Sequence, residues 1–251
     1  RNLLRDEGVV VFSIDESERA NAQKILDEIF GESGFAGEII WKNSSKNDQD
    51  YISIQHEYIL FYVKSKSYNK GAWLERKPGL DRIYEAFATF KKNHGRDWKA
   101  IHAAALEWYR SFPASDPVVD SSHYNWMDDR GVYFASDLSG PNAGQYVFDL
   151  LHRDTKQPCK MPASGWRYPK EEMFKRADDD LIHFGEDHST VPQNKTYLKD
   201  VEYQSLSSVR FLDGRGASNR LKALFGKKVF TNPKDEILIA EIARAIEVKD
   251  D

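Results

Sequence analysis

The sequence contains very little cysteine and has no long apolar run. Its single cysteine, Cys159, cannot form an internal disulfide or a cysteine-based zinc site. A single cysteine favours a reducing compartment, so we expect a cytoplasmic protein. Because no apolar stretch approaches the roughly 20 residues of a membrane-spanning helix, we expect no membrane association. The chain also starts at Arg1 without Met or a signal peptide, which suggests a beginning inside a fold.

An excess of positive charge is also missing. The net charge of −4 excludes a uniformly basic nucleic-acid binder, although it allows local basic patches. A hydrophobic content of 40% and an aromatic content of 13% suffice for a core and argue against wholesale disorder. The length of 251 residues suits one large domain or two smaller ones.

The first 64 residues have the pattern of an α/β unit. Residues 8–14 form a short apolar run rich in β-branched side chains, which predicts a strand buried on both faces. Asp15 or Ser17 then caps a predicted helix that ends at Gly31. Two more strands are predicted at 38–41 and 57–63. A strand joined to a helix by a short connection is half of an α/β unit.

The middle of the chain has a different character. Apolar positions at helical spacing predict helices over 80–90 and 98–112. They are interpreted as a helical hairpin that packs on itself, with a docking face for DNA or a partner as the alternative. Loops and short strands, such as one at 131–134, follow. Near the end, Asn232 suits a helix N-cap and Pro233 the first helical position.

Several segments resemble, in the same order, landmarks of β-class DNA amino-methyltransferases, and especially the modification (Mod) subunits of type III restriction systems. They are Leu3–Asp15, Asp27–Glu32, His56–Leu60, Gly165–Arg167, Ile182–Gly185, Ser207–Val209 and Phe230–Lys234. The resemblance is spread over nearly the whole chain.

This resemblance implies an α/β fold, a partial S-adenosylmethionine (SAM)-dependent methyltransferase sheet of Rossmann-like type, interrupted by an irregular α+β target-recognition region. Residues 1–64 would belong to the α/β core, 65–226 to the DNA-binding insert, and 227–251 to a return to the core with a SAM-side helix. The family transfers a methyl group from SAM to an exocyclic amine, and type III-like members favour adenine N6 over cytosine N4. The implied partners are double-stranded DNA, a restriction subunit with helicase and nuclease activity, and a second copy in a homodimer.

Two family motifs have no counterpart in this sequence. They are the catalytic Asp/Asn/Ser-Pro-Pro-Tyr/Phe tetrapeptide and the Phe-x-Gly-x-Gly cofactor loop; Asp116-Pro117 lies inside the insert. We therefore assign no catalytic residue to this chain and expect it to be inactive alone.

The resemblance suggests a set of cofactor-binding residues, with Lys234 placed against the SAM carboxylate. A helix N-terminus favours a carboxylate, whereas an exposed first-turn lysine is the plain alternative. For Asp15, a helix cap is the preferred explanation, although open α/β sheets also bind ligands at this edge. The full predicted set is Lys234, Asn232, Pro233, Ser13 and Asp15.

Basic and aromatic residues of the insert are the predicted DNA contacts. Cations bind phosphates and planar donors read base edges, but a solvated charged surface would contain the same residue types. The DNA-binding interpretation depends mainly on the resemblance. The predicted residues are Trp166, Arg167, Lys195, Tyr197, Lys199, Arg215 and Arg220.

An acidic cluster offers the main rival interpretation. Residues 178–188 contain five carboxylates and two histidines, which could bind a nuclease metal. The spacing matches no metal motif, so we predict no metal site. A non-catalytic DNA-binding or specificity subunit remains the other alternative, and a metal-dependent nuclease the less favoured one.

Overall fold

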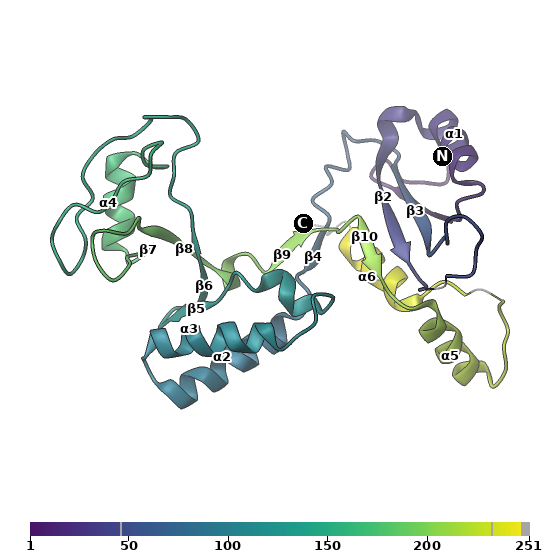
Figure 1. Cartoon of the computed structure of the whole chain (residues 1–251). Coiled ribbons are helices and arrows are strands. Elements are labelled where there is room, and N and C mark those ends of the chain that lie inside the picture. The colour runs from purple at the N-terminus through teal and green to yellow at the C-terminus, as the bar shows by residue number, and fades with distance from the viewer. Residues whose placement is uncertain (46, 232, 247–251) are drawn as a thin grey trace. The chain divides into compact units, whose positions relative to one another are not determined.

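The chain leaves one folded unit after Glu75 and returns to it at Tyr203. Unit 1 therefore comprises Arg1–Glu75 and Tyr203–Asp251, and unit 2 comprises Arg76–Glu202. The computed structural model describes residues 1–45, 47–231 and 233–246 (Figure 1). Strands β4 (Leu74–Arg76) and β9 (Tyr203–Ser205) pair in a two-stranded sheet at the points where the chain crosses between the units.

Unit 1 is built on a mixed four-stranded sheet in the order β1-β3-β2-β10. Strands β1 (Val9–Ile14) and β2 (Phe35–Lys42) both pair antiparallel with the central strand β3 (His56–Val63). Strand β10 (Val209–Phe211) adds in parallel to β2. The three strands predicted for the first 64 residues are confirmed, and β10 is a further strand supplied by a distant segment.

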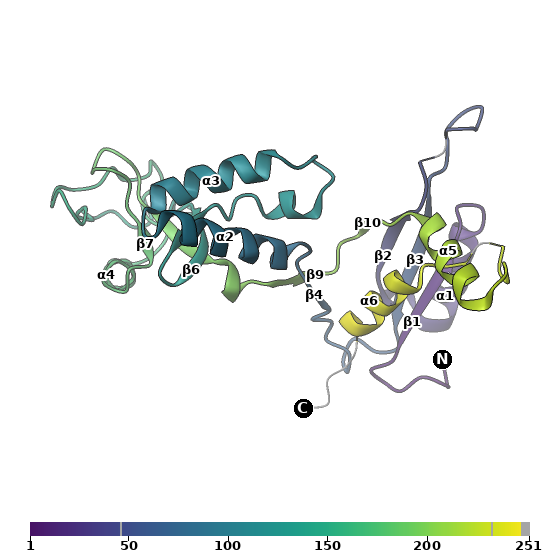
Figure 2. The ribbon, with the colours of Figure 1, turned by 90° about the horizontal axis from the view of Figure 1, so that it is seen from below.

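Helices cover both faces of this sheet (Figure 1, Figure 2). Helix α1 (Arg19–Phe30) buries Leu26 and Phe30 against Leu60 and Tyr62 of β3. Helix α6 (Glu236–Ile246) packs on the other face, where its Leu238 and Ile242 meet alternate residues of β2 and β3. Because side chains alternate along a strand, β3 can serve both cores at once. The predicted end of α1 at Gly31 is confirmed: Gly31 has φ of 82° and donates its N–H to the Asp27 carbonyl.

The prediction that residues 8–14 form a strand buried on both faces is wrong. In β1, Val11 is 41% exposed and Phe12 is 40% exposed. The reason is position in the sheet, since β1 pairs with β3 along one side and has no second neighbour among the described strands. The strand that is buried on both faces is β3, whose last five residues, Ile59–Val63, are all buried.

The start of α6 also differs from the prediction. The helix begins at Glu236, and the capping side chain belongs to Asp235, whose Oδ1 accepts hydrogen bonds from the Ile237 and Leu238 N–H groups at 2.9 and 3.2 Å. Pro233 precedes the helix instead of occupying its first turn, and Asn232 lies outside the described residues. A carboxylate at the N-cap satisfies free N–H groups and complements the helix dipole, which explains why Asp235 takes this role.

Unit 2 contains a helical hairpin packed on a small sheet. Helices α2 (Leu80–His94) and α3 (Trp98–Arg110) share one apolar core that includes Ile83, Phe87 and Ile101, so the hairpin interpretation is confirmed. The sheet has the order β5-β6-β8-β7. Its strands are β5 (Trp126–Asp128), β6 (Gly131–Ser136), β7 (Ile182–His183) and β8 (Gln193–Tyr197).

A second, loop-rich core completes unit 2. Leu138, Leu150 and Trp166 from a long irregular segment pack with Met173 of helix α4 (Lys170–Asp178) and Ile182 of β7. Short 3-10 turns at Pro117–Ser121 and Leu198–Asp200 join other elements of unit 2, and a further one lies at Glu32–Gly34 in unit 1. The loops of unit 2 are therefore held by side-chain packing and by isolated backbone bridges, such as the one between Ser139 and Trp166.

The extent of unit 2 is narrower than the predicted insert over 65–226. Residues 65–75 and 203–226 belong to unit 1, including helix α5 (Gly214–Phe225). Backbone pairing of β10 with β2 and ion pairs from Arg220 to Asp235 and Glu236 hold this returning segment in unit 1. Within the described ranges, no helix is both long and apolar enough to cross a membrane.

Candidate functional site

Polar side chains gather at the end of the unit 1 sheet where β3 begins. Glu57 shares a face with Ile59 and Phe61, which pack against α6. Its carboxylate forms an ion pair with the Lys234 ammonium, which comes just before α6, and accepts a hydrogen bond from the Asn43 side-chain amide at 3.2 Å. The Lys234 side chain remains 37% exposed and that of Glu57 21% exposed. This group therefore combines a fixed cation and anion with access to solvent.

The predicted cofactor residues Ser13 and Asp15 lie at the same end of the sheet. Ser13 is opposite Ile59 in the β1–β3 register, and Asp15 follows β1 directly. The Asp15 carboxylate accepts hydrogen bonds from the Ser17 hydroxyl at 2.6 Å and the Ser17 N–H at 3.2 Å, as expected of a carboxylate in a turn before a helix. The Ser17 hydroxyl lowers the pKa of Asp15, and the charge of Lys234 contributes in the same direction. The structure thus brings Asp15 into the electrostatic field of Lys234.

The other face of β3 carries a second polar group that the sequence interpretation did not include. The Tyr58 hydroxyl lies 3.0 Å from His56 Nε2, and the Arg19 guanidinium lies 5.6 Å from the centre of the Tyr58 ring. Arg19 also forms a 2.6 Å ion pair with Glu38 of β2. The sequence did contain a signal for this second group. Side chains alternate along a strand, so the neighbours of Glu57 at positions 56 and 58 lie on the opposite face from Glu57.

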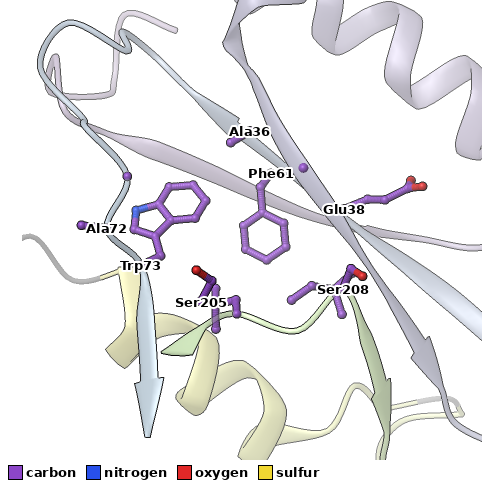
Figure 3. Close-up of a pocket in the computed structure, with 11 residues that line it drawn as sticks. Ala36, Glu38, Phe61, Ala72, Trp73, Ser205 and Ser208 are labelled. Atoms are coloured by element: carbon purple, nitrogen blue, oxygen red, sulfur yellow. The ribbon is translucent and has the colours of Figure 1, made fainter. Parts of the chain in front are cut away.

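A pocket of about 340 Å³ opens in unit 1 at the other end of β3. Its walls come from the start of β2, from residues 71–73 and from 205–208, and Phe61 faces Trp73 with ring centres 5.8 Å apart (Figure 3). The Glu38 carboxylate points away from these rings in Figure 3. Since Phe61 is four positions beyond Glu57, roughly 13 Å along a strand, the pocket and the charged group are separate features.

Three of the predicted DNA contacts are buried or nearly buried within unit 2. Trp166 is fully buried and donates its Nε1–H to the Phe148 carbonyl at 2.9 Å, so its assignment as a DNA contact is corrected to a core residue. Tyr197 is buried and donates its hydroxyl to Asp128 at 2.7 Å. Lys195 pairs with Asp128 at 2.9 Å and with Asp180 at 3.2 Å. These polar groups satisfy one another within the fold.

Arg167 and Lys199 are exposed on unit 2, as a phosphate contact requires. Lys199 lies 5.6 Å from the centre of the Tyr197 ring. Arg215 and Arg220 belong to α5 in unit 1. Arg215 is exposed beside Asp213, whereas Arg220 pairs with Asp235 and Glu236. The predicted DNA set is therefore divided between the two units and between surface and interior.

Acidic residues of the 178–188 cluster form separate ion pairs with basic side chains from other segments. Asp180 pairs with Arg153 at 2.5 Å and with Lys195, and Glu186 pairs with Lys99. His183 Nδ1 is 2.9 Å from the Tyr133 hydroxyl. Among the residues that the structure describes, no group of three His, Cys, Asp or Glu side chains is placed to hold a metal ion.

A stack of aromatic and histidine rings lies beside these ion pairs and was not predicted. His102 of α3 stacks on Trp126 with ring centres 3.7 Å apart and planes within 5°, and Trp126 also contacts His183. Burial lowers the pKa of His183 to about 4, with the charges of Lys195 and His102 acting in the same direction. Burial also raises the pKa of the Cys159 thiol to about 11, which marks it as a structural cysteine.

Comparison with known protein families identifies the chain. A family model described as DNA methylase, of the N6/N4 methyltransferase type, matches residues 1–199. The chain belongs to the N6/N4 DNA methylase family. The matched range includes the Ser13, Asp15 and Glu57 positions of the sheet and nearly all of unit 2.

Individual relatives of this DNA methylase extend the match to the C-terminal segment. The EcoP15I Mod subunit of a type III restriction-modification enzyme from Escherichia coli is 34% identical over 96% of this chain and 37% of its own length. The StyLTI Mod subunit from Salmonella typhimurium is 29% identical over 100% of this chain and 33% of its own length. The type II methyltransferase M.KpnI from Klebsiella pneumoniae is 40% identical over 92% of this chain and 51% of its own length.

The methylase chain spans about a third to a half of the length of these curated relatives. The resemblance to type III Mod subunits found in the sequence motifs is confirmed by these similarities. Membership of this family implies a methyl donor. This part of an N6/N4 methylase therefore contains a charged group at one end of the unit 1 sheet, and it also contains a loop-rich unit 2.

Proposed function

We propose that this chain forms part of a site-specific DNA methyltransferase of a restriction-modification system, which transfers the methyl group of SAM to adenine N6. The observation that supports it best is the group of Lys234, Glu57, Asn43 and Asp15 at one end of the unit 1 sheet. The segments that supply these residues come from both ends of the chain, and folding brings them together.

The chemistry of this group suits the amino-acid end of SAM. The SAM carboxylate needs a cation, which Lys234 supplies, and the SAM α-ammonium needs anions, which Asp15 and Glu57 supply. Lys234 would exchange its partner Glu57 for the carboxylate, and Asn43 would keep Glu57 oriented during that exchange. Ser13 and Pro233 border the group at the sheet and before α6. SAM supplies the reactive methyl, and these residues bind and orient it.

Unit 2 would serve as the target-recognition region. Its loops are held on two cores, and loops positioned by a rigid scaffold commonly carry recognition. Exposed Arg167 and Lys199 would contact phosphates. The target amine is unreachable inside a duplex, so the adenine would be flipped out of the helix before reaching the site in unit 1.

The partners would be double-stranded DNA, a restriction subunit and a second copy of the protein. The names of the type III relatives describe them as subunits of restriction-modification enzymes, which motivates the first two partners for this chain. The single cysteine, Cys159, continues to favour a reducing compartment, for which we propose the bacterial cytoplasm.

Transfer of radiolabelled methyl from SAM to mixed-sequence DNA tests this proposal. We expect no transfer by residues 1–251 alone, because correct positioning of the two reactants contributes roughly 7–11 kcal/mol and no tetrapeptide is present to hold the amine. An extended version that includes the flanking segments of the gene should be active. Label in thymine or guanine, or an inactive extended protein that still binds SAM and DNA, would contradict the proposed reaction.

A further inference from the structure

The segment from Gly214 to Lys234 has a charge distribution unlike that of the rest of the protein. Its 21 positions contain six basic residues and no acidic one, although the whole chain has a net charge of −4. The basic residues are Arg215, Arg220, Lys222, Lys227, Lys228 and Lys234. A cluster of one sign creates a local potential that attracts a partner of the opposite sign.

Helix α5, which occupies the first half of this segment, is fixed to unit 1 at its inner side. Ala217 is fully buried, and Arg220 pairs with Asp235 at 2.7 Å and with Glu236. The Asp235 side chain is fully buried and caps α6, so this ion pair ties α5 to the helix that follows Lys234. The Arg220 side chain is consequently a structural link between α5 and α6.

The start of α5 lies beside the candidate cofactor site. The Gly214 N–H donates to the Asn43 carbonyl at 2.9 Å, and the Asn43 side chain donates to Glu57, the partner of Lys234. Helix α5 then extends from this point over 12 residues, or about 18 Å. This length matches the rise of about five base pairs of DNA.

The outer side of α5 and the loop after it carry cations and apolar groups together. Lys222, Lys227 and Lys228 are exposed and have no ion-pair or hydrogen-bond partner in the described part of the chain. Leu224 is 74% exposed and Phe225 is 52% exposed, next to these lysines in sequence. The left-handed Gly226, with φ of 71°, ends the helix and turns the chain toward Lys227 and Lys228.

We propose that residues 214–230 form a phosphate-binding surface for DNA that flanks the cofactor site and is separate from unit 2. This inference rests on the proposed DNA methyltransferase function. Lys222, Lys227 and Lys228 contact the DNA backbone near the target nucleotide, and Leu224 and Phe225 contact sugars or the bases exposed when the duplex opens. Arg220 keeps the helix in place. The surface adds affinity without reading sequence, because phosphates are the same at every base pair.

The charge pattern favours DNA over a protein partner. A duplex presents one negative charge per roughly 1.7 Å of its axis, which suits an uninterrupted run of cations. Protein interfaces are generally depleted of lysine at their centre. In addition, the target base must reach the methyl group of a SAM molecule whose amino-acid end is bound by Lys234 and Glu57, and α5 begins beside this group, at Asn43.

The test compares two triple variants of the full-length protein by fluorescence anisotropy with a labelled duplex across a range of salt concentrations. The first variant replaces Lys222, Lys227 and Lys228 by Ala. The control replaces Lys24, Lys66 and Lys70 by Ala, which removes the same charge from exposed positions on α1 and beyond the other end of β3, together with the Lys66 hydrogen bond to the Phe35 carbonyl. Thermal unfolding of both variants confirms that each is folded.

We expect the first variant to bind roughly ten- to a hundredfold more weakly at 0.1 M salt and to lose about 2 to 3 from the slope of log K against log salt. The loss should be equal for specific and non-specific duplexes, and the control should behave like the wild type. Wild-type binding with an unchanged slope in the first variant would overturn this inference and leave the proposed function intact. A wild-type protein that binds no DNA at any salt would overturn both.

A further variant, with Leu224→Ser and Phe225→Ser, identifies a competing occupant of the surface. We expect weaker DNA binding with the salt slope retained, because apolar contacts release no counterions. If sedimentation instead shows a change of oligomeric state while DNA binding stays the same, the surface joins protein chains and the inference is wrong.

Discussion

Lys234 and Glu57 are 177 positions apart in the sequence, yet their side chains form an ion pair at one end of the unit 1 sheet. The pair connects the segment before α6 to the first residues of the central strand. Asn43 and Asp15 complete its surroundings through a hydrogen bond and through charge. Four separate segments of the chain therefore meet in one candidate site.

Replacing Lys234 should weaken SAM binding. In the full-length protein, we expect Lys234→Ala to raise the SAM dissociation constant about ten- to a hundredfold, equivalent to the loss of a charge-assisted hydrogen bond of roughly 1.5–3 kcal/mol. DNA affinity in the absence of SAM should change little. Isothermal titration calorimetry measures the effect, with Lys24→Ala as the control for removal of an exposed charge. Equal SAM affinity in both variants would show that Lys234 is an ordinary surface lysine.

Replacing Asp235 should destabilise unit 1. Asp235→Ala removes both the cap of α6 and the partner of Arg220, so we expect a loss of roughly 1–3 kcal/mol in the free energy of unfolding. Asp235→Asn keeps a capping oxygen and should lose less. Urea denaturation of the two variants beside the wild type gives the order. An Asn variant as unstable as the Ala variant would contradict the capping role.

His183 should make stability depend on pH. Its pKa in the folded protein is about 4, below the ordinary value of 6.5, because burial disfavours the charged ring. Between these values the unfolded chain binds more protons, so stability is fully present above pH 6.5 and declines as the pH falls toward 4. The slope from this residue is at most about 1.4 kcal/mol per pH unit.

Urea denaturation at pH 7.5 and pH 5 measures this dependence. The difference in stability between the two pH values should shrink in His183→Gln. The matched control is His94→Gln, since His94 is exposed at the end of α2 and should leave the difference as in the wild type. A His183→Gln protein with the same pH dependence as the wild type would contradict the assignment.

Lys195 and Lys199 should respond differently to substitution although they are four positions apart. Lys195 lies between Asp128 and Asp180 and is nearly buried, so Lys195→Ala should lower the stability of unit 2 by roughly 1–3 kcal/mol. Exposed Lys199→Ala should leave stability unchanged and weaken binding of all DNA sequences alike. Thermal unfolding and salt-dependent DNA titrations separate the two effects. A stable Lys195→Ala protein with reduced DNA affinity would restore the original DNA-contact prediction for that residue.

The sequence by itself determined the elements that depend on local pattern. The strands at 38–41 and 57–63, the end of α1 at Gly31 and the α2–α3 hairpin were predictable, because apolar periodicity and glycine conformation act over a few residues. The ordered motifs also indicated the methyltransferase family, which the comparisons confirm. Lys234 and Asp15 could be selected from these motifs alone.

Tertiary structure decided what depends on neighbours from distant segments. Val11 and Phe12 are apolar enough for a buried strand, but β1 lies at the side of the described sheet, and β3 takes the central position. Trp166, Lys195 and Arg220 are residue types that often contact DNA, yet packing, hydrogen bonds and ion pairs with other elements hold them in the fold. Burial and pairing are properties of the surroundings of a side chain, and the type of the residue does not specify them.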